Sequence, residues 1–238
     1  MYSPKTLKVP FENKILAALS REDYEHIAVR AEPVRLAAGK VLCQSGEQLR
    51  HAYFLRGGMV SLLSVMENGA TVEVGMIGSE GVVGGSAMLG MDVMPYQLTV
   101  QLSGNALRLG INTLREEFSR GGMLQTLMLR YLHTVLTQVS QSAACNRFHT
   151  LEERLSRWLL VSRDRARTDT FNLTQEFISQ MIGAPRTRVT IVASNLQKEG
   201  LIRYSRGKIQ IIDGRGLESS ACECYRIVSE QISHFIAA

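Results

Sequence analysis

Basic and hydroxyl side chains gather in a short C-terminal segment where they could bind nucleic acid. Residues 186–190 read Arg-Thr-Arg-Val-Thr. An arginine can donate two parallel hydrogen bonds to a guanine, and threonine hydroxyls can bond to bases or phosphates. The side chains with this capacity are Arg186, Thr187, Arg188 and Thr190. We expect these four to contact DNA.

The charge of the whole chain is concentrated around this segment. The 238 residues carry a formal net charge of +5. Residues 149–215 alone contain 12 Lys or Arg against 7 Asp or Glu, a surplus equal to that of the entire chain. A localised positive field is typical of a surface that binds a polyanion. The charge pattern therefore supports nucleic acid as the partner.

The residues around this segment predict a helix-turn-helix. Thr174 is placed to cap a first helix, which should end at Gly183. A short turn with Pro185 then leads to a second helix over residues 186–198. The start of such a second helix meets the base edges in the major groove, which is where the four candidate residues fall.

A wing is predicted after the second helix. Residues 203–212 place two short strands on either side of a basic turn. Such a turn brings its cations close to the phosphate backbone. We expect Arg206 and Lys208 to touch phosphates, and we add Thr174, at the start of the first helix, to the expected DNA contacts.

The N-terminal half has the pattern of a β-domain. Between residues 30 and 115, short apolar stretches alternate with glycines, which is typical of a barrel or sandwich. Strands are predicted at 52–55 and 59–65, and Asn68-Gly69 predicts a hairpin turn before the next strand.

A long helix of about 25 residues is predicted after Gly121-Gly122. It carries two apolar stripes at four-three spacing, which predicts packing against its own β-domain and against a second copy of the chain. A purely intramolecular core helix is the alternative. We assign the dimer contact to the first stripe, which comprises Leu124, Met128, Tyr131 and Val135. The second stripe comprises Leu129, Leu132, Leu136, Val139 and Ala143.

Composition excludes several other classes of protein. No apolar run is long enough to span a membrane, and the N-terminus lacks the layout of a signal peptide, so we expect a cytoplasmic protein with no membrane partner. Four scattered cysteines cannot form a disulfide scaffold. No nucleophile with a nearby base and no cluster of acids is recognisable, and we therefore expect no enzymatic activity.

Together these features resemble the Crp/Fnr family of bacterial regulators. The resemblance rests on Met181-Ile182-Gly183 through Leu201-Ile202, the wing, the long helix and the glycine-rich β-segment. It implies an α+β fold with a jelly-roll-like β-roll sensor domain (1–115), a long dimerisation helix (116–147) and a winged helix-turn-helix (148–238). It also implies a homodimer that binds an inverted repeat in double-stranded DNA, RNA polymerase as a partner, and an unidentified small-molecule effector.

The chain departs from the family where cyclic nucleotides bind. Nucleotide-binding members carry a glycine-glutamate pair for the ribose and an arginine followed by serine or threonine for the phosphate. Alignment places Gly85-Ser86 and Tyr96-Gln97 at these positions, so the charged phosphate partner is missing. We do not expect cyclic AMP in its usual mode. An apolar or weakly polar effector would bind near Ser86, Met88, Tyr96, Gln97, Met128 and Tyr131.

The recognition helix departs from the family as well. The arginine-glutamate pair at its start reads Arg186-Thr187, and Ile191 occupies a later position where an arginine contacts a base. Arg186 can still read guanine. We therefore expect a different target sequence.

Metal and haem cofactors are not expected from the sequence. The family's iron-sulfur cluster needs cysteines near the N-terminus, and no cysteine precedes Cys43. Cys222 and Cys224 are separated by one residue, closer than the C-x-x-C spacing of many metal sites, and the next histidine along the chain is His234. The histidines available for haem are isolated, and they are His26, His51, His133 and His149.

Two alternatives to an effector-gated regulator remain open. The chain could bind DNA without any ligand. It could also be a β-roll interaction module with a non-functional helix-turn-helix, although the cations at 186, 188, 206 and 208 argue against this.

Overall fold

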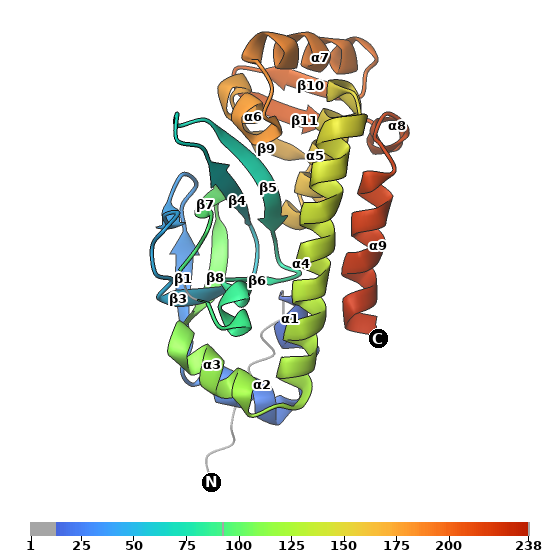
Figure 1. Cartoon of the computed structure of the whole chain (residues 1–238). Helices are drawn as coiled ribbons and strands as arrows, with labels where there is room; N and C mark the ends of the chain where they lie inside the picture. Colours follow the sequence, from blue (N-terminus) through green and yellow to red (C-terminus); the bar gives the residue numbers. More distant parts are fainter. Residues whose placement is uncertain (1–12, 92, 238) are drawn as a thin grey trace.

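A β-roll and a winged helix-turn-helix occupy opposite ends of the molecule, and one long helix runs alongside both (Figure 1). This computed structural model describes residues 13–91 and 93–237. The N-terminal segment that lacks the layout of a signal peptide lies outside the described residues. The observed architecture confirms the α+β fold predicted from the sequence.

Two antiparallel four-stranded sheets make up the roll. The first has the order β1 (Glu32–Leu36), β8 (Gly104–Gly110), β3 (His51–Leu55) and β6 (Val82–Val83). The second has the order β2 (Val41–Cys43), β7 (Gln97–Leu102), β4 (Met59–Val65) and β5 (Thr71–Ile77). Inward side chains such as Phe54, Leu62 and Leu98 form the core. The two predicted strands and the Asn68-Gly69 turn, where Gly69 has φ +81°, are confirmed.

Short helices close the roll at the end away from the winged helix (Figure 1). They are α1 (Lys14–Ala17), α2 (Arg21–Ala28), the 3-10 helix η1 (Gly85–Leu89) and α3 (Ile111–Ser119). Arg30, just after α2, forms ion pairs with Glu116 and Glu117 of α3. These ion pairs hold the end of α2 against α3, the helix that precedes the long helix.

The long helix α4 spans Gly122–Phe148, as predicted after Gly121-Gly122. It ends where His149 adopts an extended conformation and Thr150 caps the next helix, α5 (Leu151–Ala166), through a capping box with Glu153. The chain therefore turns sharply between two helices that each have a well-defined end.

One face of α4 packs on the roll. Leu124, Met128 and Tyr131 are buried inside the chain, and Val135 is half-buried, so the first stripe is occupied intramolecularly. A Cβ at Gly81 would lie 2.2 Å from the Tyr131 ring, which explains the glycine at this close approach. The second stripe faces outward, since Leu129 is 50% and Leu136 is 64% exposed.

The winged helix contains a three-stranded sheet of order β10-β11-β9, and its apolar core extends to Met59, Leu63 and Met76 of the roll. Its elements are β9 (Thr170–Asn172), α6 (Gln175–Ile182), α7 (Arg186–Lys198), β10 (Ile202–Ser205), β11 (Lys208–Ile211) and α8 (Gly214–Ser219). Trp158 and Leu159 of α5 contribute to this core. Helix α5 is therefore an integral part of the domain.

The last helix, α9 (Cys224–Ala237), leaves the winged helix and runs back along α4 toward the roll (Figure 1). The ring of Phe235 lies 5.8 Å from that of Tyr131, measured between centroids. We expected this segment to be part of the winged-helix domain (148–238), because it carries no sequence motif that sets it apart from that domain. In the structure it covers a side of α4 instead.

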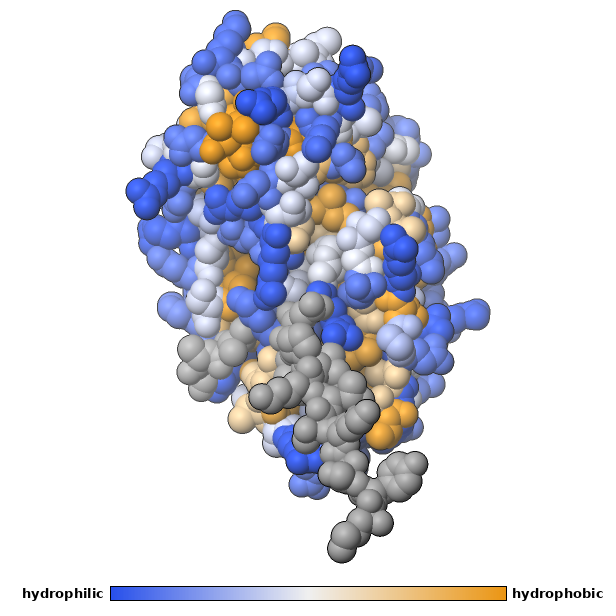
Figure 2. All heavy atoms as spheres, turned by 180° about the vertical axis from the view of Figure 1, so that it is seen from behind, coloured by the Kyte–Doolittle hydropathy of each residue, from blue (hydrophilic) through white to orange (hydrophobic). Residues whose placement is uncertain are grey.

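Seen from behind the view of Figure 1, the surface is mostly hydrophilic, and its hydrophobic side chains lie in small separate patches (Figure 2). None of the described helices is long and apolar enough to cross a membrane.

Candidate nucleic-acid interface

The predicted helix-turn-helix is formed by α6, a short turn and α7. The Thr174 hydroxyl caps α6 by accepting a hydrogen bond of 3.1 Å from the Phe177 backbone N–H. Gly183 ends α6 with φ +65°, a left-handed conformation that glycine adopts without strain. Pro185 then begins α7. The caps predicted from the sequence are confirmed.

Helix α7 has one buried and one exposed face. Val189, Ala193 and Leu196 are buried in the winged-helix core. The opposite side of its first turn is exposed and carries Arg186, Thr187 and Arg188. The core contacts thus fix which side chains can reach a groove of DNA.

Thr190 lies in a different environment from the other candidate contacts. It is half-buried, and its hydroxyl lies 2.8 Å from Gln175 Oε1 and 2.9 Å from the Arg186 carbonyl oxygen. These contacts tie the start of α7 to the start of α6. Thr190 therefore positions the recognition helix within the domain.

The wing is a tight two-residue hairpin between β10 and β11. Arg206 and Gly207 have φ +51° and +75°, the left-handed conformations that a type I′ turn requires. The Gly207 carbonyl accepts a 2.7 Å hydrogen bond from the Leu173 backbone N–H, which holds the wing beside the start of α6. Lys208 follows directly and is exposed.

An open groove of about 420 Å³ separates the wing from the two helices. Its lining comprises Thr174, Gln175, Arg186, Tyr204, Ser205, Arg206 and Gly207. Among the described residues, no side-chain ion pair engages Arg186, Arg188, Arg206 or Lys208. Such free cations can meet phosphates without first breaking an internal ion pair.

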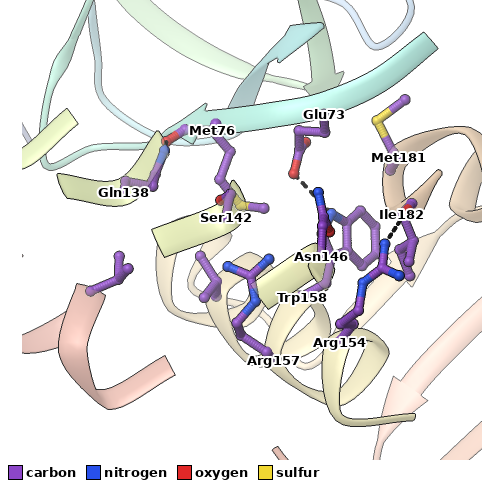
Figure 3. A pocket seen from close by; sticks show the side chains of 13 residues that line it. Glu73, Met76, Gln138, Ser142, Asn146, Arg154, Arg157, Trp158, Met181 and Ile182 are labelled. Carbon is purple, nitrogen blue, oxygen red and sulfur yellow. Dashed lines mark hydrogen bonds between the residues drawn. The ribbon is translucent and has the colours of Figure 1, made fainter. Parts of the chain in front are cut away.

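A polar pocket lies where the winged helix meets the roll (Figure 3). Its free volume is about 20 Å³, which is room for about one water molecule. Glu73 of β5 accepts hydrogen bonds of 3.0 Å from Trp158 Nε1 of α5 and 2.5 Å from the Ser61 hydroxyl of β4. On another side of the same pocket, Arg154 of α5 donates a hydrogen bond to the Ile182 carbonyl oxygen.

The Glu73 carboxyl is the most strongly perturbed acid of this junction. Burial raises its pKa to about 7, against the lowering effects of the hydrogen bonds from Ser61 and Trp158 and of the charges of Arg165 and Arg157. The protonation state of this junction therefore changes near neutral pH.

A second polar contact joins α5 to the roll. Arg165 is 4% exposed and donates hydrogen bonds to the Met76 carbonyl oxygen and to Gln138 Oε1. Its Nε lies 3.2 Å from Glu80 Oε1, a charge contact that is not aligned as a hydrogen bond. Glu80 also accepts a 2.9 Å hydrogen bond from the Gly78 backbone N–H. One arginine thus connects the roll, α4 and the winged helix.

Most of the predicted effector residues lie together in the roll. Tyr96 donates a 3.2 Å hydrogen bond to Ser86, and Ser86 lies 3.8 Å from the sulfur of Met94. Met128 and Tyr131 of α4 pack against Gly85 at the start of η1. Met88 is half-buried against the same core.

Gln97 donates to Thr99 along β7, a contact separate from the Ser86 group. Side chains of the chain itself occupy the space at Met128 and Tyr131, which are 0% and 3% exposed. An effector at this place would have to displace them.

The structure brings three cysteines and a histidine together at the junction of α4 and α5. Cys145 and His149 come from the end of α4, Cys222 from the segment between α8 and α9, and Cys224 from the start of α9. A hydrogen bond from Cys222 lowers the pKa of Cys145, with a further contribution from the charge of Arg157. The sequence did not indicate His149 as a partner of Cys222, because the two residues are far apart along the chain and close only in the folded structure.

Two family models match the chain. A model of the cyclic nucleotide-binding domain matches residues 33–120, and a model of the Crp-like helix-turn-helix domain matches residues 153–220. Together they span about two thirds of the chain. A comparison with curated protein sequences gave no match.

Several solved structures share the fold over most of their length. A Crp/Fnr-family transcriptional regulator from Eubacterium rectale has a TM-score of 0.68 at 16% identity, covering 90% of this chain and 99% of that chain. FixK2 from Bradyrhizobium japonicum has a TM-score of 0.67 at 13% identity, covering 81% and 98%. A CRP-family regulator from Thermus thermophilus has a TM-score of 0.64 at 21% identity, covering 79% and 96%.

A roll of the cyclic nucleotide-binding type, a long helix and a winged helix-turn-helix define a transcription regulator with a DNA-binding domain. The chain belongs to the Crp/Fnr family.

Glu73→Gln should remove a pH-dependent component of stability. Because the folded pKa of about 7 lies above the ordinary value of 4.5, the folded protein holds an extra proton between these values, and its stability falls as pH rises through this window. We expect the wild type to lose about 2–3 kcal/mol between pH 5 and pH 8 from this group. Urea unfolding at both pH values measures the loss.

The exposed Glu67, in the turn after β4, provides the matched control as Glu67→Gln. It should retain the wild-type pH dependence, whereas Glu73→Gln should flatten it. Identical pH dependence in Glu73→Gln and the wild type would contradict the assignment.

Proposed function

We propose that the chain is a homodimeric, sequence-specific regulator that binds an inverted repeat in double-stranded DNA. The observation that carries the proposal is the exposed start of α7 beside the wing, where Arg186 and Arg188 form no side-chain ion pair with any residue that the structure describes. RNA polymerase is the partner such a regulator would act upon.

Each candidate residue has a role that follows from its position. Arg186 is placed to read a guanine, and Arg188 and Thr187 flank it on the same exposed turn. Arg206, Lys208 and Thr174 line or border the wing groove and would bind phosphates. Thr190 supports this surface through Gln175 rather than by contacting DNA.

We assign the dimer contact to the second stripe of α4. Leu124, Met128 and Tyr131 are already buried within the chain, whereas the second stripe has three-four spacing and includes two leucines that are at least half exposed. Such spacing matches the seam of a two-stranded coiled coil. The stripe comprises Leu129, Leu132, Leu136, Val139 and Ala143.

For the roll we propose a regulatory role without a cyclic nucleotide in the usual mode. The position of the phosphate-binding arginine is occupied by Tyr96, which bonds to Ser86. Apolar side chains surround this pair, including the buried Met94 and Met128. An effector would therefore be apolar or weakly polar and would reorganise η1 and α4.

Arg186→Ala should reduce both affinity and specificity. We expect a loss of about 1–3 kcal/mol on the preferred operator and a relaxed preference at one base pair, because a bidentate contact to a base is removed. Lys208→Ala should weaken binding to all sequences alike and reduce the salt slope by about 1. Fluorescence anisotropy over a range of salt concentrations measures both effects.

Lys198→Ala, at the far end of α7, is the control for loss of one positive charge. It should change operator affinity less than Arg186→Ala does. Equal losses for Arg186→Ala on operator and random DNA would show that Arg186 contacts phosphate only.

Leu136→Glu should convert the dimer into a monomer. Leu136 is 64% exposed in the single chain, so the substitution should leave the fold intact while placing a charge in the dimer seam. We expect a shift to the monomer mass in sedimentation velocity and at least a roughly tenfold loss of operator affinity.

Val29, which is 81% exposed at the end of α2, supplies a control as Val29→Glu, which should remain dimeric. A Leu136→Glu variant that sediments as the wild type would overturn the assigned interface.

A further inference from the structure

Four potential metal ligands converge where α4, α5 and α9 meet. The sulfur atoms of Cys145, Cys222 and Cys224 and a ring nitrogen of His149 all lie within 4.8 Å of one another. Two segments more than seventy residues apart in the chain supply them. The three cysteines form a small buried cluster separate from the two apolar cores, so their burial is not explained by packing of either core.

The spacing of these atoms fits one tetrahedral ion. Bonds of about 2.3 Å to sulfur and about 2.0–2.1 Å to nitrogen set neighbouring ligand atoms roughly 3.5–3.8 Å apart. The Cys145 and Cys222 sulfur atoms are 3.5 Å apart, and the Cys224 sulfur is 3.6 Å from His149 Nδ1. Two edges of the tetrahedron therefore have the required length already.

The histidine is oriented as a metal ligand requires. Its Nδ1 faces the cysteines, while its Nε2 lies 3.1 Å from a carboxylate oxygen of Glu223. A proton on Nε2 can be donated to Glu223, which leaves the Nδ1 lone pair directed at the sulfur atoms. A carboxylate behind a ligating histidine is a recurrent feature of zinc sites. Glu223 lies between Cys222 and Cys224 in the sequence.

A hydrogen-bond donor and two cations lie near the sulfur atoms. Gln141 donates a 3.1 Å hydrogen bond from Nε2 to the Cys224 sulfur. The positive charges of Arg154 and Arg157 act on Cys145. Three thiolates around a divalent ion leave one net negative charge, which these two cations offset.

We propose that Cys145, His149, Cys222 and Cys224 bind a single zinc-class ion. Sulfur and imidazole donors suit Zn²⁺, whereas Mg²⁺ and Ca²⁺ require oxygen ligands. A two-iron cluster would distribute these ligands over two metal atoms, more widely than the compact group allows. All three sulfur atoms belong to buried residues, so the site is closed, as structural zinc sites are.

The ion would fasten α9 to the junction at which α4 ends and α5 begins. His149 is the C-cap residue of α4, and Thr150 caps α5. Metal binding at His149 would therefore restrict the angle between the long helix and the winged helix. The site would stabilise the arrangement of the two DNA-reading domains relative to the dimer helix.

Metal content of the purified full chain tests the proposal. We expect one equivalent of Zn²⁺ per chain by elemental mass spectrometry, removable by a chelator under reducing conditions and restored by added Zn²⁺. Replacement by Co²⁺ should give the visible absorption of a tetrahedral thiolate complex. Absence of binding both as purified and after reconstitution overturns the proposal, as does a Cys145–Cys222 disulfide or stoichiometric iron and sulfide.

Single substitutions identify the ligands. Competition with a chromophoric chelator should show a loss of about 10–100-fold in Zn²⁺ affinity for Glu223→Gln, whose side chain is exposed, and a larger loss for Cys224→Ser and His149→Ala. Cys43→Ser is the matched control, because Cys43 is a buried thiol in the roll. Wild-type affinity in both Cys224→Ser and His149→Ala, or an equal loss in Cys43→Ser, would contradict the assigned ligands.

Discussion

One buried arginine joins the winged helix to the roll, beside apolar contacts from Met59, Leu63 and Met76 of the roll. Arg165 projects from α5 into the gap between the roll and α4, where it meets the Met76 carbonyl, Gln138 and Glu80. A guanidinium removed from water must have acceptors and a counter-charge nearby, or its burial is strongly unfavourable. The arginine therefore favours the docked arrangement in which these partners surround it.

This arrangement orients the DNA-reading surface. Helix α5 is shared by the docking contacts and the winged-helix core, since Arg165 and Trp158 bond to the roll while Trp158 and Leu159 also pack in the core. Any rearrangement of the roll that moves β5 would be transmitted to α5 and then to α7. The polar junction thus connects the roll to the helix-turn-helix.

Local pattern was sufficient to predict most of the fold. The strands at 52–55 and 59–65, the Gly121-Gly122 start of α4 and the Thr174 and Gly183 caps depend on near neighbours in sequence, and all are confirmed. The resemblance to the Crp/Fnr family supplied the order of domains, which the family models bear out.

Features that depend on tertiary contact were not visible in the sequence. Both stripes of α4 are equally apolar, and only the docking of the roll and α9 decides which one remains exposed. Glu73 had one local signal, a carboxylate between valines in a strand, but its partner Trp158 lies 85 positions away. His149 joins Cys222 and Cys224 only because α9 returns to the end of α4.

Selection of binding sites from a random duplex library by the purified full chain, at near-physiological salt and without added ligand, tests the central claim most directly. The account predicts enrichment of one inverted repeat whose half-sites lie about 34 Å apart, one helical turn. It also predicts that the Arg186→Ala variant loses the preference at one position in each half-site. Recovery of a common sequence without inverted symmetry, or of the same repeat with unchanged preference by Arg186→Ala, would contradict it.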